Sequence, residues 1–124
     1  VPVTANELEQ VLLNLLKNAA QAIHQRDNQS APGQIILRSK LCPPWAVIEV
    51  EDNGVGMPDA VRKRIFEPFF TTKEVGQGTG LGLSVSYFIV TNNHKGQLEV
   101  QSRPRKGTTF TLRLPLEPPQ NLES

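Results

Sequence analysis

The sequence lacks the features that mark several large classes of protein. It contains one cysteine, Cys42, which excludes an internal disulfide and leads us to expect a reducing, cytoplasmic setting. It has no signal-peptide pattern and no long apolar run, so we expect no direct membrane contact by this chain, even if a parent protein is membrane-anchored. The 13 Lys and Arg residues nearly balance the 12 Asp and Glu residues, and no basic run is dense. We therefore expect no nucleic-acid partner.

The length is that of a single domain. A chain of 124 residues is large enough for one hydrophobic core and too short for two independent ones. From Pro115 onward the sequence is rich in proline and polar residues. We therefore assign residues 1–116 to the domain and predict that residues 117–124 form a disordered tail.

Two stretches have the periodicity of amphipathic helices. In the first, from Asn6 to Ile23, apolar residues recur at three- and four-residue steps, and Thr4 or Asn6 is suited to cap it. The second runs from Gly80 to Asn93 and ends before Gly96. Its predicted apolar stripe consists of Leu81, Val85, Phe88 and Ile89. A shorter helix is expected from Pro58 to Phe66, because proline is favoured in the first helical turn.

Four stretches have the composition of β-strands. Gln34–Lys40 and Ala46–Asp52 are rich in Ile, Leu and Val, and the prolines between them suit a hairpin connection. Two alternating strands follow the second long helix, with inward faces at Leu98, Val100 and Ser102 and at Phe110, Leu112 and Leu114. The pattern predicts an α+β two-layer sandwich, in which helices cover one face of a mixed, mostly antiparallel sheet.

Three polar residues lie along one strip of the first helix. Asn14, Asn18 and Gln21 are spaced four and three residues apart, beside the apolar face. Asparagine is a poor helix former. Its amide oxygen is a ligand that Mg²⁺ accepts alongside water and phosphate oxygens. The strip is consistent with a metal site and, taken alone, equally with a solvated helix face.

Asp52 is a carboxylate at a position that the strand alternation assigns to the core. It is in phase with Ile48 and Val50, and burying it without a partner would be costly. An adenine amino group is a suitable donor, and Gly54 and Gly56 would let a backbone approach a flat ring. The alternative is an ordinary turn, because Asp, Asn and Gly in succession are common in turns.

A glycine-rich stretch, residues 78–82, precedes the second helix. Alternating glycines there can present backbone N–H groups to phosphate oxygens near the positive end of the helix dipole. The alternative interpretation is a simple connection between two elements. It does not follow a strand and lacks the lysine of a P-loop, so the dinucleotide-binding and Walker interpretations are excluded.

The segment Glu67–Thr79 has no periodicity and is a candidate lid. Phe66, Phe69 and Phe70 need a packing site, which would allow a closed state over a ligand and an open state without it. Lys73, which follows two threonines, would then reach a phosphate, although a solvated lysine is the simpler interpretation.

Taken in order, these stretches resemble the nucleotide-binding boxes of sensor histidine kinases. The resemblance covers nearly the whole chain. The N box corresponds to Glu9–Ala20, the G1 box to Asp52–Met57, the F box to Phe66–Lys73, the G2 box to Gly78–Leu83 and the last glycine motif to Gly107–Phe110. Each box alone is of moderate specificity, whereas five in the family order are highly specific.

The resemblance implies a Bergerat-type fold that binds ATP and Mg²⁺. Asn18 would coordinate the metal, Asn14 would lie near the phosphates and Asp52 would bind the adenine amino group, in a pocket shaped by Gly54 and Gly56. Gly78, Gly80 and Gly82 would line the phosphate side. The remaining implied nucleotide contacts are Gln21, Ala22, Met57, Phe66, Thr71, Thr72, Lys73, Thr79, Leu81, Leu83 and Thr108.

The sequence departs from the family pattern after the metal asparagine. Many members carry Lys and Tyr where Gln21 and Ala22 stand. Neutralisation of phosphate charge would then fall on Lys73, as in the nitrogen-sensor branch with its short lid. The implied catalytic residues are therefore Asn14, Asn18 and Lys73.

Asn14 favours a kinase over a hydrolase. Gyrase-type and mismatch-repair ATPases of this fold carry a glutamate one turn before the metal asparagine, and an amide cannot take a proton from water. Neither His24 nor His94 has the acidic neighbour of the family's acceptor box. The acceptor histidine is therefore expected on a separate dimerisation domain, with a response regulator as indirect partner. We expect the isolated chain to be monomeric, to bind nucleotide and not to phosphorylate itself.

Three alternatives remain open. A pseudokinase would bind nucleotide without transferring phosphate to a supplied acceptor domain. A serine kinase of the same fold would give an acid-stable product, unlike phosphohistidine. An ATPase would release phosphate steadily without an acceptor.

Overall fold

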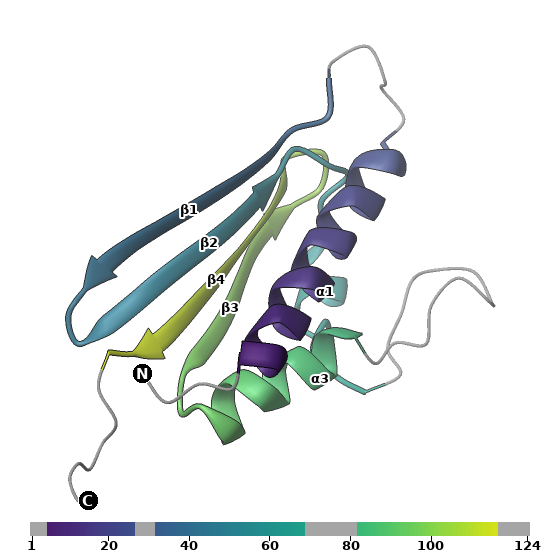
Figure 1. The fold of residues 1–124 in the computed structure, drawn as a ribbon. Coiled ribbons are helices and arrows are strands. Elements are labelled where there is room, and N and C mark those ends of the chain that lie inside the picture. The colour runs from purple at the N-terminus through teal and green to yellow at the C-terminus, as the bar shows by residue number, and fades with distance from the viewer. Residues whose placement is uncertain (1–4, 27–31, 69–81, 117–124) are drawn as a thin grey trace, which may run out of the picture.

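The computed structural model describes residues 5–26, 32–68 and 82–116. Two helices, α1 and α3, lie on the same side of a β-sheet (Figure 1). In chain order the elements are α1 (Ala5–His24), β1 (Ile35–Cys42), β2 (Trp45–Asp52), α2 (Asp59–Arg62), α3 (Gly82–Phe88), a π-helical turn η1 (Ile89–Asn93), β3 (Gln97–Arg103) and β4 (Gly107–Pro115). The predicted α+β two-layer architecture is confirmed.

The four described strands form one sheet in the order β1-β2-β4-β3. All three pairings are antiparallel. The β1–β2 hairpin closes through Pro43 and Pro44, whose peptide bond is cis, directly after the pair Cys42 and Trp45. The predicted hairpin is therefore confirmed, and it extends two residues further than expected along β1.

The core lies between α1 and the helix-facing side of the sheet. Phe110 on β4 pairs with Val50 and Val100, and the next inward residue, Leu112, pairs with Ile48 and Leu98. Both Phe110 and Leu112 are buried. From α1, the residues Val11, Leu15 and Ala19 pack into the same cluster. Their spacing of four residues keeps them on one face of the helix, as the periodicity predicted.

The same inward rows become polar at one end of the sheet. Beyond Val50, Phe110 and Val100, the next inward positions are Asp52, Thr108 and Ser102, and these three lie side by side in the register. Because strand side chains alternate, all three face the layer that holds the helices. The end of the sheet therefore presents hydrogen-bonding groups where its centre presents apolar ones.

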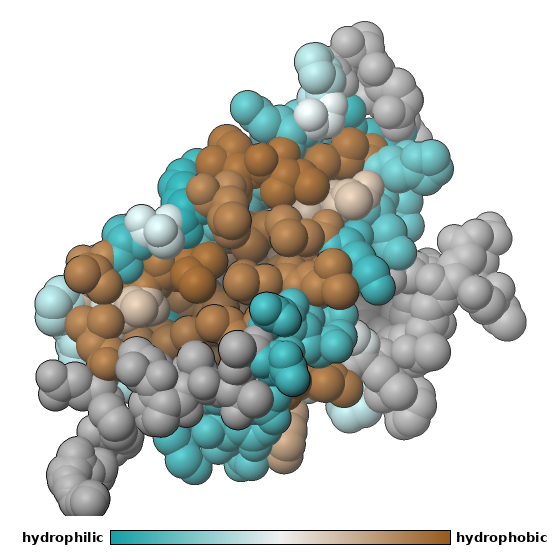
Figure 2. Space-filling model, in the orientation of Figure 1, coloured by the Kyte–Doolittle hydropathy of each residue, from teal (hydrophilic) through white to brown (hydrophobic). Residues whose placement is uncertain are grey.

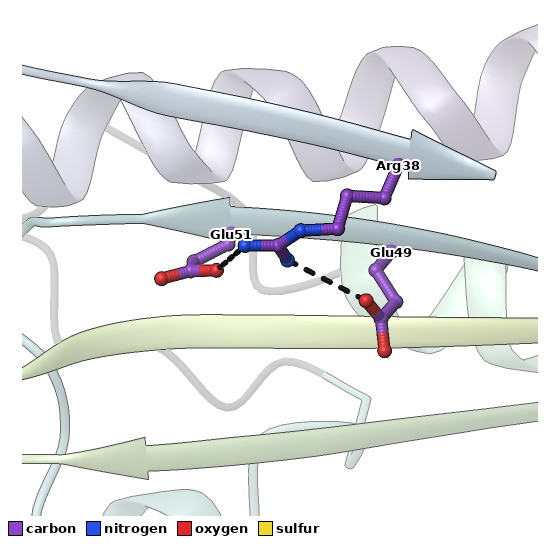
Figure 3. A network of polar contacts seen from close by, with 3 residues as sticks. All are labelled: Arg38, Glu49 and Glu51. Carbon is purple, nitrogen blue, oxygen red and sulfur yellow. Dashed lines mark hydrogen bonds and ion pairs between the residues drawn. The ribbon is translucent and has the colours of Figure 1, made fainter.

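The opposite face of the sheet carries cross-strand ion pairs. Arg38 on β1 reaches to Glu49 and Glu51 on the neighbouring strand β2, with N to O distances of 3.4 and 2.5 Å (Figure 3). Arg113 pairs with Glu99 at 2.6 Å. Exposed pairs of this kind contribute little to stability, because solvent screens their charges. They mark the solvated side of the sheet and take no part in the site described below.

Two helix predictions differ from the structure. The short helix ends at Arg62 and not at Phe66, because the chain continues in tight turns with hydrogen bonds three residues apart. The predicted stripe on the second long helix is partly right: Ile89 is buried as predicted, whereas Val85 and Phe88 are exposed and Ser86 is buried instead. Leu81 lies outside the described residues. The π-helical turn η1, which begins at Ile89, places the neighbours Ile89 and Val90 both in the core.

One apolar surface is exposed on the face seen in Figure 2, over α1 and the sheet beside it. Its most exposed members include Leu13 on α1 and Leu37 and Leu41 on β1, at 49%, 58% and 72%. β1 is an edge strand of the described sheet, and α1 does not cover its inward side chains. None of the described helices combines the length and apolar character needed to cross a lipid bilayer.

Candidate functional site

A pocket of about 290 Å³ opens at the polar end of the sheet. It is bounded by the second half of α1, the loop after β2, the segment around α2 and one residue of β4. The predicted site residues that line it are Asn18, Gln21, Ala22, Gly56, Met57 and Thr108. The residues that were not predicted are Gln25, Val55, Pro58, Val61 and Ile65. These additional residues are mostly apolar and suit the flat face of a ring.

Asp52 is buried beside this pocket with half of its carboxylate unsatisfied. The residue is 3% exposed, and its register partner Thr108 lines the pocket. Its Oδ1 accepts a hydrogen bond from the Gly54 N–H at 2.8 Å, whereas Oδ2 is buried and has no partner. Burial raises the pKa of this carboxyl, and the backbone N–H groups of Gly54 and Thr108 oppose the rise. An N–H donor on a ligand would complete the group, and an adenine amino group fits this requirement.

The loop after β2 is held in place by close backbone contacts. The Val55 N–H donates to the Ala22 carbonyl at 2.9 Å, and a Cβ on Gly54 would lie 2.5 Å from the Ala22 carbonyl carbon. Gly56 has a φ of +72°, and a Cβ there would lie 1.9 Å from the Arg103 carbonyl oxygen. The two glycines therefore allow the loop to contact α1 on one side and β3 on the other.

Ser102 connects three parts of the site. Its hydroxyl accepts from the Met57 N–H at 2.9 Å, donates to the Gly107 carbonyl at 3.0 Å and lies 2.9 Å from the Thr108 hydroxyl. The sequence placed Ser102 on the inward face of its strand and did not identify it as a site residue. The sequence feature that could have identified Ser102 is a hydroxyl residue that follows Leu98 and Val100 on one face of a strand.

The asparagine strip of α1 divides between two environments. Asn18 and Gln21 line the pocket. The Asn14 side-chain amide instead donates to the Gly82 carbonyl at 3.1 Å and to the Ser86 hydroxyl at 3.0 Å, and its oxygen accepts from Gln10 at 3.2 Å. In the part of the chain that the structure describes, Asn14 therefore fixes the start of α3 against α1.

The remaining candidates lie outside the pocket or outside the described residues. Phe66 stacks on Tyr87 at a centroid distance of 4.8 Å and meets the edge of Phe110 at 6.3 Å. Leu83 packs against the core, and the Gly82 carbonyl receives Asn14. The candidates outside the described ranges are Thr71, Thr72, Lys73, Gly78, Thr79, Gly80 and Leu81. Most of the candidate lid shares that position.

The two histidines lie away from the pocket lining. His94 contacts the Glu7 carboxylate at 2.9 Å, its side chain is 6% exposed, and the neighbouring Asn93 donates to the same carboxylate at 3.1 Å. These contacts join the end of η1 to the first turn of α1. They indicate a structural role for His94.

The described residues offer one chemical fit for a hard cation. Residues 5–26, 32–68 and 82–116 contain no group of three His, Cys, Asp or Glu side chains that could hold a metal ion. Asn18 supplies a side-chain oxygen at the pocket wall. Mg²⁺ takes few protein oxygens when water and phosphate complete its shell, so this donor is suitable for a metal that arrives with a nucleotide.

The sequence matches known histidine kinases over nearly its whole length. Residues 4–118 match the family of histidine kinase-, DNA gyrase B-, and HSP90-like ATPases. The chain is 46% identical over 123 residues to the signal transduction histidine-protein kinase AtoS of Escherichia coli (strain K12), covering 97% of this chain and 19% of that protein. It is 42% identical over 119 residues to sporulation kinase E of Bacillus subtilis (strain 168), covering 95% of this chain and 15% of that protein.

Solved structures show the same likeness in three dimensions. The catalytic domain of the histidine kinase ThkA, in a nucleotide-free form, matches with a TM-score of 0.77 at 31% identity, over 94% of this chain and 71% of that one. The mycobacterial sensor histidine kinase MprB matches with a TM-score of 0.77 at 29% identity, over 93% and 76%. This chain belongs to the histidine kinase-, DNA gyrase B-, and HSP90-like ATPase family, and it is the catalytic ATP-binding domain of a sensor histidine kinase.

Proposed function

We propose that this domain binds ATP with Mg²⁺ and transfers the γ-phosphate to a histidine on a separate dimerisation domain of the same kinase. The observation that carries the proposal is the Asp52 Oδ2, a buried acceptor without a partner beside an apolar pocket. A response regulator would then receive the phosphate from that histidine, and the domain would work in the cytoplasm.

The adenine ring is recognised by the end of the sheet. Asp52 Oδ2 accepts a hydrogen bond from the 6-amino group, and the neighbouring Thr108 lies on the same inward row. Val55, Met57 and Ile65 supply apolar surface to the ring. A buried acceptor that is satisfied only by the ligand favours bases with a donor at this position, because other bases leave it unpaired.

The phosphates extend from the ring toward the end of the pocket where Asn18 and Gln21 lie. Asn18 would hold Mg²⁺ through its amide oxygen, and the ion would supply positive charge to the phosphates. Lys73, from the candidate lid, and the glycines at 78, 80 and 82 are proposed to contact the same phosphates. Asn14 contributes by fixing the start of α3, to which that glycine stretch leads.

Transfer to an imidazole is favoured over hydrolysis because the site has no base for water at Asn14. Both hydrogens of its amide nitrogen are donated, to Gly82 and Ser86, and an amide nitrogen does not accept a proton. A neutral imidazole nitrogen attacks with its own lone pair. Positioning and charge neutralisation are then sufficient for the reaction.

Two experiments test the proposal. Titration calorimetry should show magnesium-dependent binding of ADP, and Asp52→Ala should lower the affinity by at least about a hundredfold, since a buried donor then loses its acceptor. Ser39→Ala, a substitution at an exposed position on β1, is the matched control.

ATP mixed with the chain and a histidine-containing acceptor domain should then give an acid-labile phosphoprotein. Steady phosphate release without acceptor would indicate an ATPase, and an acid-stable product would indicate a serine kinase.

A further inference from the structure

The hydroxyl of Ser102 has a complete set of hydrogen-bond partners. It lies 2.9 Å from the Met57 N, 3.0 Å from the Gly107 carbonyl oxygen and 2.9 Å from the Thr108 Oγ1. A serine hydroxyl has one hydrogen to donate and two lone pairs that accept. Three partners therefore use all of its capacity, and the direction of each bond can be assigned by counting.

Two of the three directions are fixed by chemistry. The Met57 N–H can only donate, so it donates to Ser102. The Gly107 carbonyl can only accept, so the single Ser102 hydrogen goes to it. One lone pair of Ser102 remains, and the Thr108 hydroxyl must fill it by donating its own hydrogen.

The opposite assignment is unfavourable. If Ser102 donated to Thr108, the Ser102 oxygen and the Gly107 carbonyl oxygen would face each other at 3.0 Å with no hydrogen between them. Two acceptor oxygens at that distance repel each other, and both Gly107 and Thr108 are buried. The Thr108 hydrogen therefore points toward Ser102, and its lone pairs are left for the pocket that Thr108 lines.

We propose that Ser102 is a positioning residue that makes Thr108 an obligate acceptor and so helps the pocket to select adenine at the 6-position of the purine. The inference rests on the proposed function and deepens it. The adenine 6-amino group has two hydrogens, and Asp52 Oδ2 and Thr108 Oγ1, cross-strand neighbours, supply one acceptor each. Hypoxanthine has a carbonyl oxygen at that position, which would face two acceptors and no donor.

Loss of Ser102 should change base selectivity and not only affinity. In Ser102→Ala the Thr108 hydrogen is released and can rotate to donate to a carbonyl oxygen. IDP then binds better relative to ADP. The ratio of the IDP to the ADP dissociation constant should therefore fall by about tenfold, which corresponds to the free energy of one hydrogen bond. A purely structural role would weaken both nucleotides together and leave the ratio unchanged.

The experiment is calorimetry of ADP and IDP, each with Mg²⁺, on the wild type, Ser102→Ala and Ser102→Thr. Threonine keeps the hydroxyl and suits a strand, so it should preserve the wild-type ratio. Ser39→Ala, at an exposed position on β1, should behave as wild type. An unchanged ratio in Ser102→Ala, or equal narrowing in Ser102→Thr, would overturn the proposal.

A second variant keeps the proposal testable if Ser102→Ala does not fold. Thr108→Val removes the proposed acceptor and should narrow the ratio, because only ADP loses a partner. If Thr108 were instead a donor, the same change would widen the ratio by removing a partner from IDP. Failure of the wild type to bind ADP would refute the proposed function itself, whereas normal ADP binding with an unmoved ratio would refute only the role of Ser102.

Discussion

Replacing Asp52 by Asn should stabilise the nucleotide-free domain at neutral pH while removing its nucleotide affinity. The carboxylate is 3% exposed and its Oδ2 has no partner. Asparagine keeps an oxygen that can accept from the Gly54 N–H, as Oδ1 does at 2.8 Å, and removes the buried charge. The site therefore carries a cost to stability that only a ligand relieves.

The gain should be on the order of 1–2 kcal/mol, because an unpaired buried charge is replaced by an unpaired neutral amide hydrogen. For a domain of this size, that corresponds to a rise of about 3–8 °C in Tm. The effect on binding has the opposite sign. In one orientation the side-chain NH2 group of the asparagine faces the Gly54 N–H, and in the other it faces the adenine amino group. Two donors meet in either case, so ADP affinity should fall by about a hundredfold or more.

The stabilisation should depend on pH in a defined direction. Burial raises the folded pKa of Asp52 above its ordinary value of 3.8, so the folded state holds this proton more tightly than the unfolded state. As pH rises from below 3.8 through the raised value, the wild type loses stability at this site, and above that value the loss is constant. The advantage of Asp52→Asn is therefore absent at acid pH and complete at neutral pH.

Thermal and urea denaturation between pH 3.5 and about 8 measures this difference, with calorimetry of ADP in parallel. Asp59→Asn is the matched control. Asp59 is exposed, and its pair with Arg62 at 2.9 Å lowers its pKa, so its replacement should slightly destabilise the protein at neutral pH. A lower Tm for Asp52→Asn at neutral pH, or retained ADP affinity, would refute the reasoning.

Three further substitutions test the supports of the site. Gly54→Ala places a methyl group 2.5 Å from the Ala22 backbone, so it should lower the free energy of unfolding by about 2 kcal/mol or more and weaken ADP binding. An unchanged urea midpoint would contradict the contact. Asn14→Ala removes both hydrogen bonds that hold α3, so it should lower the free energy of unfolding by about 1–2 kcal/mol. Amide hydrogen exchange should speed up more in α3 than in β2, and an equal increase in both would contradict this role of Asn14. His94→Ala should cost about 1 kcal/mol through lost contact with Glu7, yet leave phosphotransfer to a supplied acceptor domain intact, and loss of transfer in the folded variant would show a chemical role.

The sequence predicted the fold and the position of Asp52 because both follow from simple periods. A strand alternation that placed Val50 inward also placed Asp52 inward, and the structure confirms its burial. The second long helix was predicted less well. Val85 and Phe88 are exposed although they lie in the regular helix α3, and the π-helical turn η1 that follows places the neighbours Ile89 and Val90 both in the core. Ser86 is buried because it receives Asn14, a contact between residues 72 positions apart that no local pattern encodes.

Ser102 shows the same limit within the site. Its three partners come from the loop after β2 and from the start of β4, and only the strand register brings them together. A serine at the end of an alternating strand is common, so composition alone gave no reason to single it out. The glycines were identified correctly as necessary but for a different reason. The structure shows that Gly54 and Gly56 allow backbone contacts with α1 and β3, which shape the loop before any ring arrives.

The asparagine strip of α1 explains how one sequence pattern can serve two purposes. Asn14 and Asn18 are four residues apart and share a helix face, so periodicity assigned them to one site. The start of α3 covers the turn that carries Asn14, whereas the pocket begins at the next turn, with Asn18. The first amide therefore fixes the element that follows the glycine-rich stretch, and the second lines the pocket. A strip of identical residues can thus link the nucleotide pocket to the segment that is proposed to close over it.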